Sequence, residues 1–305
     1  MTRKFRFGIA ALHDATAETF AEHARTAEAL GYASLQVFDE LRGVPFTPVP
    51  ALAYAAAVTD TITLSAYVFD NGYRHPIILA KDAATLDVLS GGRLELGLGA
   101  GYSEDEYRGS GIPFGPPGER VTRVEESIQI LKGLFSGDPV TFDGRFYQLS
   151  DAVCTPSPVQ KPWPRLLIGG ARERLLSLAG AEADIVSFAF SGPGGFREDA
   201  SEERTTRKLA WVRAAAGARF DELELENLVN VRFGTNRASA ADESSARTGV
   251  PADWLLGSPH LLFGSPAEMA ETILERRERY GFSYLSVRPH DAIQRFAEVI
   301  RLVGG

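Results

Sequence analysis

The feature that most constrains the fold is a strand pattern, a helix pattern and a second strand pattern that follow one another between Ile62 and Tyr102. Ile62 to Val68 is rich in β-branched and aromatic residues, as strands are. Pro76 opens a run with apolar residues at helical spacing, and Leu94 to Leu98 is apolar again. This order predicts a βαβ unit with parallel strands, and such folds bind ligands in the loops that follow the strand ends.

The same alternation of strand and helix patterns continues along the chain. The predicted strands are Phe5 to Leu12, Ala33 to Phe38, Ile62 to Val68, Leu94 to Leu98, Arg165 to Ile168, Ile185 to Phe190, Leu225 to Phe233 and Ser283 to Arg288. Helical patterns separate them, among them Thr16 to Gly31, Pro50 to Val58, Arg120 to Phe135, Glu202 to Ala216, the run from Ser265-Pro266-Ala267-Glu268 to Gly281, and Ala292 to Val303. Eight strands alternating with helices over 305 residues favour one α/β domain, residues 1–305, folded as a (β/α)₈ TIM barrel rather than a doubly wound sheet.

Three stretches fall outside this alternation and are predicted to be insertions, near residues 103–118, 137–164 and 234–262. The second contains Val140 to Leu149, which is typical of a β-hairpin with a tight turn at Asp143-Gly144. The polar stretch from Gly234 to His260 is poorly periodic, so either a mobile loop or a helical excursion remains open.

Composition excludes several classes of function. A net charge of −8, with no cluster of Lys and Arg, argues against a nucleic-acid partner. Cys154 is the only cysteine, so no intrachain disulfide can form, and no Cys/His spacing for a metal is present. The sequence contains no apolar stretch of ~18 residues, the length that a membrane-spanning helix needs. We therefore expect a cytoplasmic protein that acts on a small molecule, without nucleic acid, membrane or metal.

Two glycine-rich segments are candidate ligand loops. Gly97, Gly99 and Gly101 do not form a dinucleotide-binding G-x-G-x-x-G, because Tyr102 and Glu104 stand where the last glycine would be needed. Gly169, Gly170 and Ala171 lie between a predicted strand and a predicted helix. Free N–H groups at that helix start could hold a phosphate, with charge added by Arg172 and Arg174, or the two glycines could simply turn the chain.

Several motifs together resemble the bacterial luciferase-like oxidoreductase superfamily. They are FGI near the start, VFDE after the second strand, YRHP, LSGGRLELGLGAGY and PRLLIGGARERLLSLAGAEADIV. The branch that uses the deazaflavin coenzyme F420 is the most similar. The resemblance implies a barrel with an insertion near Val140, a cofactor at the C-terminal face of the barrel, and a homodimer.

The resemblance also implies roles for individual residues. A non-prolyl cis peptide at Tyr67-Val68 would support the cofactor ring, and Ala100, Gly101 and Tyr102 would lie against its pyrimidine edge. The loop of Ile168, Gly169, Gly170 and Ala171 would hold the ribityl chain and the phosphodiester. Asp39 and Glu40 would lie beside the reactive ring, although many deazaflavin enzymes have histidine at the second position. The alternatives are an ordinary trans strand end, a plain barrel-strand terminus and two solvated carboxylates.

The favoured function is hydride transfer between the deazaflavin and an electron-poor C=C, C=N or carbonyl group of a small organic substrate. Glu40 is the first candidate for the proton donor and Tyr102 the second, with Asp39 beside them. One alternative is an FMN-dependent luciferase-like monooxygenase, since the same barrel and loops would serve it. The other is a non-catalytic subunit that supports a catalytic relative.

Overall fold

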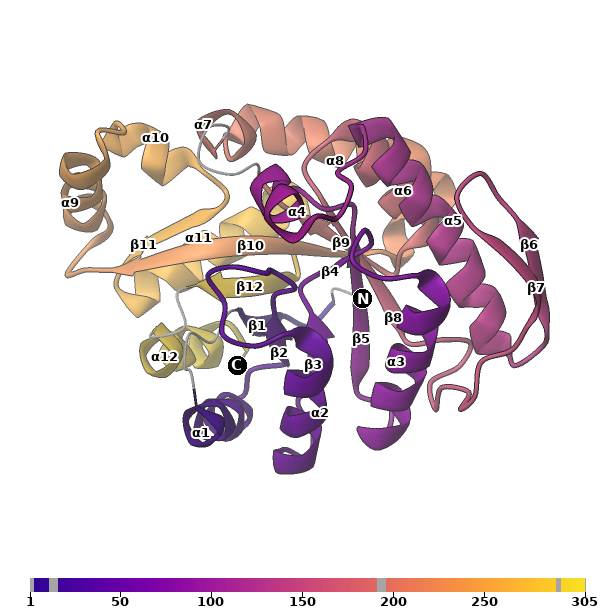
Figure 1. Cartoon of the computed structure of the whole chain (residues 1–305). Helices are drawn as coiled ribbons and strands as arrows, with labels where there is room; N and C mark the ends of the chain where they lie inside the picture. The colour runs from indigo at the N-terminus through magenta and orange to yellow at the C-terminus, as the bar shows by residue number, and fades with distance from the viewer. Residues whose placement is uncertain (1–2, 11–15, 191–195, 289–291, 305) are drawn as a thin grey trace.

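Eight parallel strands close into a barrel in the computed structural model, which describes residues 3–10, 16–190, 196–288 and 292–304 (Figure 1). Each strand pairs in parallel with the next, and β10 pairs with both β9 and β12, which closes the ring. In ring order the strands are β1 (Arg6–Ala10), β2 (Ser34–Val37), β3 (Thr63–Ala66), β5 (Leu94–Gly99), β8 (Arg165–Gly170), β9 (Ile185–Phe188), β10 (Glu224–Phe233) and β12 (Tyr284–Arg288). The predicted TIM barrel is confirmed.

Helices cover the outside of the barrel (Figure 1). They bury apolar faces against the strands, and the shared core contains residues from almost every element. The helices are α1 (Ala17–Ala29), α2 (Pro48–Val58), α3 (Pro76–Leu89), α5 (Pro117–Ser136), α6 (Glu173–Glu182), α8 (Glu202–Ala216), α11 (Pro266–Tyr280) and α12 (Ile293–Gly304). None of the described helices is long and apolar enough to cross a membrane.

Local sequence signals account for several of these boundaries. Ser265 accepts a hydrogen bond from the backbone N–H of Glu268, whose carboxylate accepts one in return from the Ser265 backbone. This capping box starts α11 where the sequence predicted a helix start. Gly281 ends the same helix with φ +80°, a left-handed conformation that glycine adopts without steric penalty.

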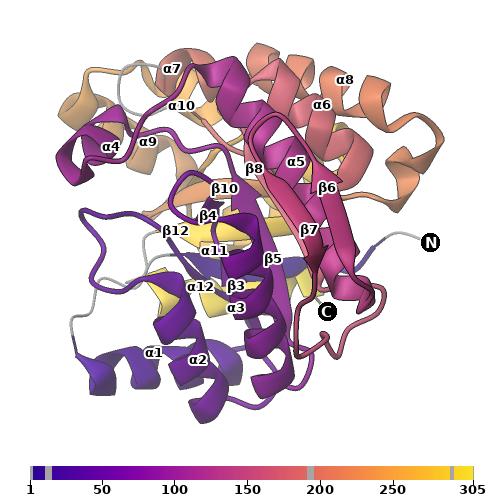
Figure 2. The same cartoon turned by 45° about the vertical axis from the view of Figure 1, so that its right-hand side comes forward.

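The predicted insertions take defined structures. Residues 103–118 contain α4 (Glu104–Ser110), and the stretch after Gly234 is helical, with α9 (Arg237–Thr248) and α10 (Ala252–Gly257). Two further short elements are α7 (Phe196–Asp199) and the 3₁₀ helix η1 (Gly217–Glu222). The predicted hairpin is present as β6 (Val140–Asp143) and β7 (Gln148–Ala152), and it lies over α5 on the outside of the barrel (Figure 2).

The structure corrects two details of the sequence interpretation. The hairpin turn is not a two-residue Asp-Gly turn, since Asp143 pairs with Gln148 and four residues connect them. Leu261–Gly264 forms an additional strand, β11, which pairs with the C-terminal half of β10 and begins within the predicted insertion at 234–262. The end of the predicted first strand is not tested, because residues 11 and 12 lie outside the described part.

The barrel interior is unusually polar near the N-terminal ends of the strands. Arg6 lies between Glu95 (2.9 Å) and Glu224 (2.8 Å), and its guanidinium stacks on the Tyr284 ring at 4.3 Å. The Tyr284 hydroxyl donates to Glu95 at 3.1 Å. Ala10, Leu167, Ile185 and Leu228 form a small apolar cluster with Tyr67 and Tyr284. The polar residues contrast with the branched aliphatic residues that usually fill such barrels.

Candidate active site

Two of the three predicted catalytic residues contact each other at the C-terminal face of the barrel. The Tyr102 hydroxyl, from the loop after β5, donates to the Glu40 carboxylate, from the loop after β2, at 2.7 Å. Desolvation of the Tyr102 hydroxyl and the adjacent Glu40 charge both raise the pKa of Tyr102, while the charge of Arg288 opposes them. The hydroxyl therefore stays protonated at neutral pH and available as a donor.

Arg288 ends β12 and approaches the same rim. Its guanidinium lies 5.0 Å from the centre of the Phe38 ring, next to Asp39 and Glu40 in the chain. Within the described part of the chain, no carboxylate forms an ion pair with Arg288. The rim therefore presents a carboxylate, a phenol and a guanidinium close together.

Asp39 is held by the protein. Arg74 binds both of its carboxylate oxygens, through Nη1 at 2.5 Å and Nη2 at 3.0 Å, and the backbone N–H of Asp70 donates to it at 2.9 Å. The side chain of Asp39 is only 4% exposed. Because each oxygen already has a charged partner, Asp39 acts first as the anchor that joins the loop after β2 to the loop before α3. Its contact with a cofactor ring remains a prediction.

Val68 lies at the base of the candidate site, where the strand after β3 is interrupted. The Tyr67-Val68 peptide is cis, as the resemblance predicted, and it separates β3 from the short strand β4 (Phe69–Asp70). A Cβ on Gly99 would lie 2.6 Å from the Val68 side chain, and one on Gly97 would lie 2.0 Å from the carbonyl oxygen of Ala66. These two glycines thus accommodate the protein's own chain at the strand interruption.

Gly101 packs against a buried carboxyl. A Cβ there would lie 2.5 Å from the Tyr107 hydroxyl and 2.6 Å from Asp70 Oδ2. Tyr107 donates to Asp70, and the backbone N–H of Gly72 donates to it at 2.8 Å. Burial raises the pKa of Asp70 to about 6, against the opposing effect of these hydrogen bonds. Asp70 is a titratable group near the site that the sequence analysis did not identify.

Gly169 and Gly170 do not lie in the loop where the sequence analysis put them. They are the last residues of β8, and Gly170 lies close to Leu175, since an added Cβ would be 3.1 Å from that side chain. Ala171 is the only residue between β8 and Arg172, the N-cap of α6. Arg172 pairs with Asp199 at 3.1 Å, and Arg174 binds the start of α5 through Gly118 and Thr122. The expected phosphate loop is therefore short, and both of its arginines contact protein groups.

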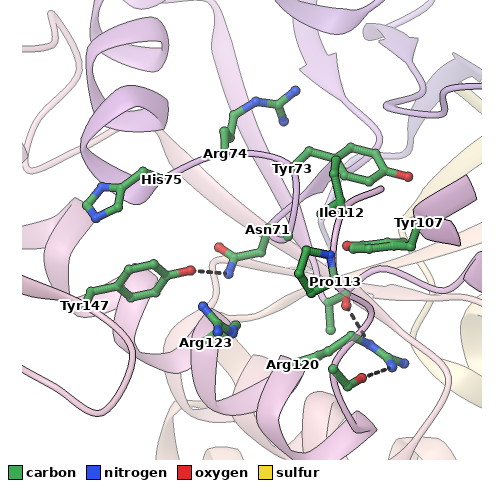
Figure 3. Close-up of a pocket in the computed structure, with 13 residues that line it drawn as sticks. Asn71, Tyr73, Arg74, His75, Tyr107, Ile112, Pro113, Arg120, Arg123 and Tyr147 are labelled. Carbon is green, nitrogen blue, oxygen red and sulfur yellow. Dashed lines mark hydrogen bonds between the residues drawn. The ribbon is translucent and has the colours of Figure 1, made fainter. Parts of the chain in front are cut away.

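Cationic groups gather instead in a cavity of about 320 Å³ beside Ala100 (Figure 3). Its lining includes Arg74, Arg120 and Arg123 and no acidic residue. Arg120 donates to the carbonyls of Ala100 (3.1 Å) and Gly115 (2.8 Å), whereas Arg123 stacks on Phe146 at 4.1 Å. This lining suits an anionic group.

Asn71 contributes a second feature to this cavity. Its Nδ2 donates to the Tyr147 hydroxyl at 3.3 Å, while its Oδ1, also buried, has no hydrogen-bond partner (Figure 3). His75 lines the cavity too, and its Nδ1 caps α3 by accepting from the Ile77 N–H at 3.3 Å. The sequence analysis missed Asn71, Arg120 and Arg123. A signal was available, since Arg120 and Arg123 are three residues apart at the start of a helix and therefore share one face.

A model of the family described as luciferase-like monooxygenase matches residues 4–279. The chain belongs to the luciferase-like monooxygenase family. It is 30% identical over 251 residues to an F420-dependent glucose-6-phosphate dehydrogenase of Nakamurella multipartita, covering 78% of this chain and 71% of that protein. It is 32% identical over 128 residues to an FMNH(2)-dependent dimethylsulfone monooxygenase of Pseudomonas putida, covering 42% and 35%.

Two further comparisons concern an uncharacterized relative and a solved structure. The chain is 33% identical over 183 residues to an uncharacterized protein of Mycobacterium tuberculosis, and the match spans 53% of this chain and 62% of that relative. The coenzyme F420 dependent tetrahydromethanopterin reductase of Methanopyrus kandleri has the same fold, with a TM-score of 0.81, 19% identity and coverage of 98% and 99%. The relatives of the chain thus include enzymes named for F420 and for FMNH(2).

Proposed function

We propose that this luciferase-like protein is a coenzyme F420-dependent oxidoreductase that transfers a hydride between the deazaflavin and an electron-poor C=C, C=N or carbonyl carbon of a small organic substrate. The observation that carries the proposal is the hydrogen-bonded pair of Tyr102 and Glu40 at the rim, 2.7 Å apart. The F420-dependent relative from Nakamurella multipartita supports it, because that alignment covers 78% of this chain. The alignment with the FMNH(2)-dependent enzyme covers 42%.

The residues present fit a large anionic cofactor. The strand interruption at Val68, with Gly99 and Gly169 beside it, and the small residues Ala100 and Gly101 would leave room for a flat ring. The adjacent cavity provides Arg120 and Arg123, and the Oδ1 of Asn71 is free to accept a hydrogen bond. Both F420 and FMN carry a phosphate ester, which this lining would bind through charge-assisted hydrogen bonds. In this arrangement Ile168 to Ala171 would border the ring on the side of β8.

When bound, the cofactor supplies the hydride acceptor or donor, which amino acid side chains cannot provide. The chain's own residues supply the proton. Hydride transfer to a polarised double bond leaves a neighbouring atom that needs a proton. Glu40 would donate that proton, and Tyr102, which is hydrogen-bonded to Glu40 at the rim, would replace it. Arg288 lies where it would orient a polar substrate, and Arg74 keeps Asp39, and with it the Glu40 loop, in place. We also propose that the chain acts as a homodimer.

Binding titrations of the purified protein with F420 and with FMN test the proposal. We expect the fluorescence of F420 to report saturable binding and FMN to bind much more weakly. Arg123→Met should weaken F420 binding and reduce its dependence on salt, because one cation is lost from the cavity. Binding of FMN alone would favour the monooxygenase alternative, for which reduced flavin is the partner of oxygen. Binding of neither cofactor would favour the non-catalytic subunit.

A further inference from the structure

Three glutamates face the interior of the barrel, and one of them lacks a cationic partner. Glu95 is bound by Arg6, and Glu224 by Arg6 and by Arg165 at 2.9 Å. Glu226 lies two residues after Glu224 on β10, so both side chains point inward. Its residue is 0% exposed, and within the described part of the chain no cation reaches it. Its surroundings are therefore different from those of the two paired acids.

The neighbours of Glu226 are hydroxyl groups. The Tyr67 hydroxyl donates to Oε2 at 2.9 Å, and the same hydroxyl lies 2.9 Å from Ser187 Oγ. Ser286 also faces it, from β12. The hydroxyls of Ser187, Ser286 and Tyr67 lower the pKa of Glu226, whereas burial and the nearby charge of Glu95 raise it, and burial has the largest effect. Because no cation of the described residues offsets the burial of a charge here, ionisation of Glu226 is unfavourable.

Tyr67 connects Glu226 to the candidate active site. Its hydroxyl is inside the barrel, its ring packs edge-on against Phe38 at 5.7 Å, and its carbonyl carbon begins the cis bond to Val68. Phe38 directly precedes Asp39 and Glu40 in the chain. A change in the hydrogen bond between Glu226 and Tyr67 therefore reaches both the floor of the rim and the proton-donating pair within two residues.

We propose that Glu226 is a positioning residue whose uncharged carboxylic acid form fixes Tyr67, and through it Phe38 and Val68, beneath the cofactor ring. The resemblance to the luciferase-like superfamily implied no role for Glu226. The part of the proposal that concerns the ring rests on the proposed function. The protonation of Glu226 does not, because it follows from the packing of the protein alone.

Infrared spectroscopy tests the protonation directly. Near neutral pH, we expect the carbonyl stretch of a protonated carboxyl group, and labelling with ¹³C-glutamate should shift it, which separates it from Asp70. Glu226→Gln should remove the band. A band that is missing in the wild-type protein, or that persists in Glu226→Gln, would overturn the proposal. Labelling of the wild-type protein keeps the test decisive if the variant does not fold.

Glu95→Gln is the matched control, because it neutralises a buried acid that does have a cationic partner. We expect Glu226→Gln to unfold at the same or higher urea concentration than the wild type above neutral pH, since it preserves the neutral state. Glu95→Gln should unfold at a lower concentration, since it leaves Arg6 without one of its counterions. Equal losses in both variants would contradict the uncharged state.

Coenzyme affinity tests the positioning role without measuring activity. Burial raises the pKa of Glu226 to about 7. If only the neutral form holds Tyr67 correctly, wild-type affinity for F420 should fall about tenfold from about pH 6 to about pH 8, and Glu226→Gln should show no such fall. The same fall in both proteins would overturn the positioning role. Failure of the wild type to bind F420 or FMN at any pH would instead overturn the proposed function, and the infrared and unfolding results would still decide the state of Glu226.

Discussion

Gly99→Ala is the sharpest test of how the floor of the site is built. The new Cβ would lie 2.6 Å from Cγ2 of Val68, well inside the ~3.5 to 4.0 Å at which carbon atoms attract. Val68 must move by about 1 Å, and a β-branched side chain has few rotamers with which to do so. We therefore expect the strain to remain in the folded protein.

The size of the effect follows from two opposing contributions. Overpacking a well-packed interior costs about 1 to 3 kcal/mol. Alanine regains about 0.5 to 1 kcal/mol over glycine in a strand, because it restricts the unfolded chain. The net loss in the free energy of unfolding should therefore lie between about 0 and 2.5 kcal/mol, with a midpoint of about 1 kcal/mol. Val68→Ala removes the clashing methyl group, so the double variant should show a coupling energy of about 1 to 2 kcal/mol.

Two other glycines provide controls. Gly169→Ala would place its Cβ 3.4 Å from Val68, an ordinary contact, and should change the free energy of unfolding little or raise it. Gly97→Ala meets the backbone carbonyl of Ala66 at 2.0 Å, so Val68→Ala should not rescue it. Equilibrium unfolding in urea measures all of these values. Equal stability of the Gly99 and Gly169 variants, or a coupling energy below about 0.5 kcal/mol, would refute this account of the glycines.

Two further predictions concern titratable groups. Glu40→Gln should lower turnover by about 10²-fold or more with F420 affinity unchanged, because glutamine keeps a hydrogen bond to Tyr102 but cannot take up a proton and pass it on. Steady-state kinetics beside a binding titration measures this, and unchanged turnover would discard the role. Asp70, with its pKa raised to about 6, holds a proton in the folded state that the unfolded chain releases near pH 4. Its contribution to stability should therefore fall as pH rises from about 4 to about 6, by up to ~3 kcal/mol, and urea unfolding of Asp70→Asn should lack this dependence.

The sequence predicted the elements whose signals are local. The bounds of α8, Glu202–Ala216, match the prediction, and the capping residues Ser265 and Glu268 predicted the start of α11. Leu261–Gly264 was missed because four residues show no period, and only pairing with the outer half of β10 makes them a strand. Gly169 and Gly170 were predicted to lie in a phosphate-binding loop, with a simple turn as the alternative, but both belong to β8, where packing against Leu175 favours glycine at position 170.

The candidate site was predictable only where the resemblance supplied positions. Asp39, Glu40, Tyr102 and the Tyr67-Val68 bond lie together at the rim as expected. The ion pair of Arg74 with Asp39 joins residues 35 positions apart, and no spacing rule connects them. Acids at alternate positions of a strand normally indicate a solvent-facing side, which is why Glu224 and Glu226 gave no signal of a polar barrel interior.

The order of charged residues along the barrel axis links these observations. At the N-terminal ends, Arg6 compensates Glu95 and Glu224, and at the rim Arg74 compensates Asp39. Between these two compensated layers lies Glu226, whose hydrogen-bonding neighbours are hydroxyl groups and which no cation of the described residues contacts. An interior of low dielectric screens a buried charge poorly. Under the proposed function, an uncharged Glu226 would therefore add no uncompensated negative charge to the barrel interior below a bound redox ring.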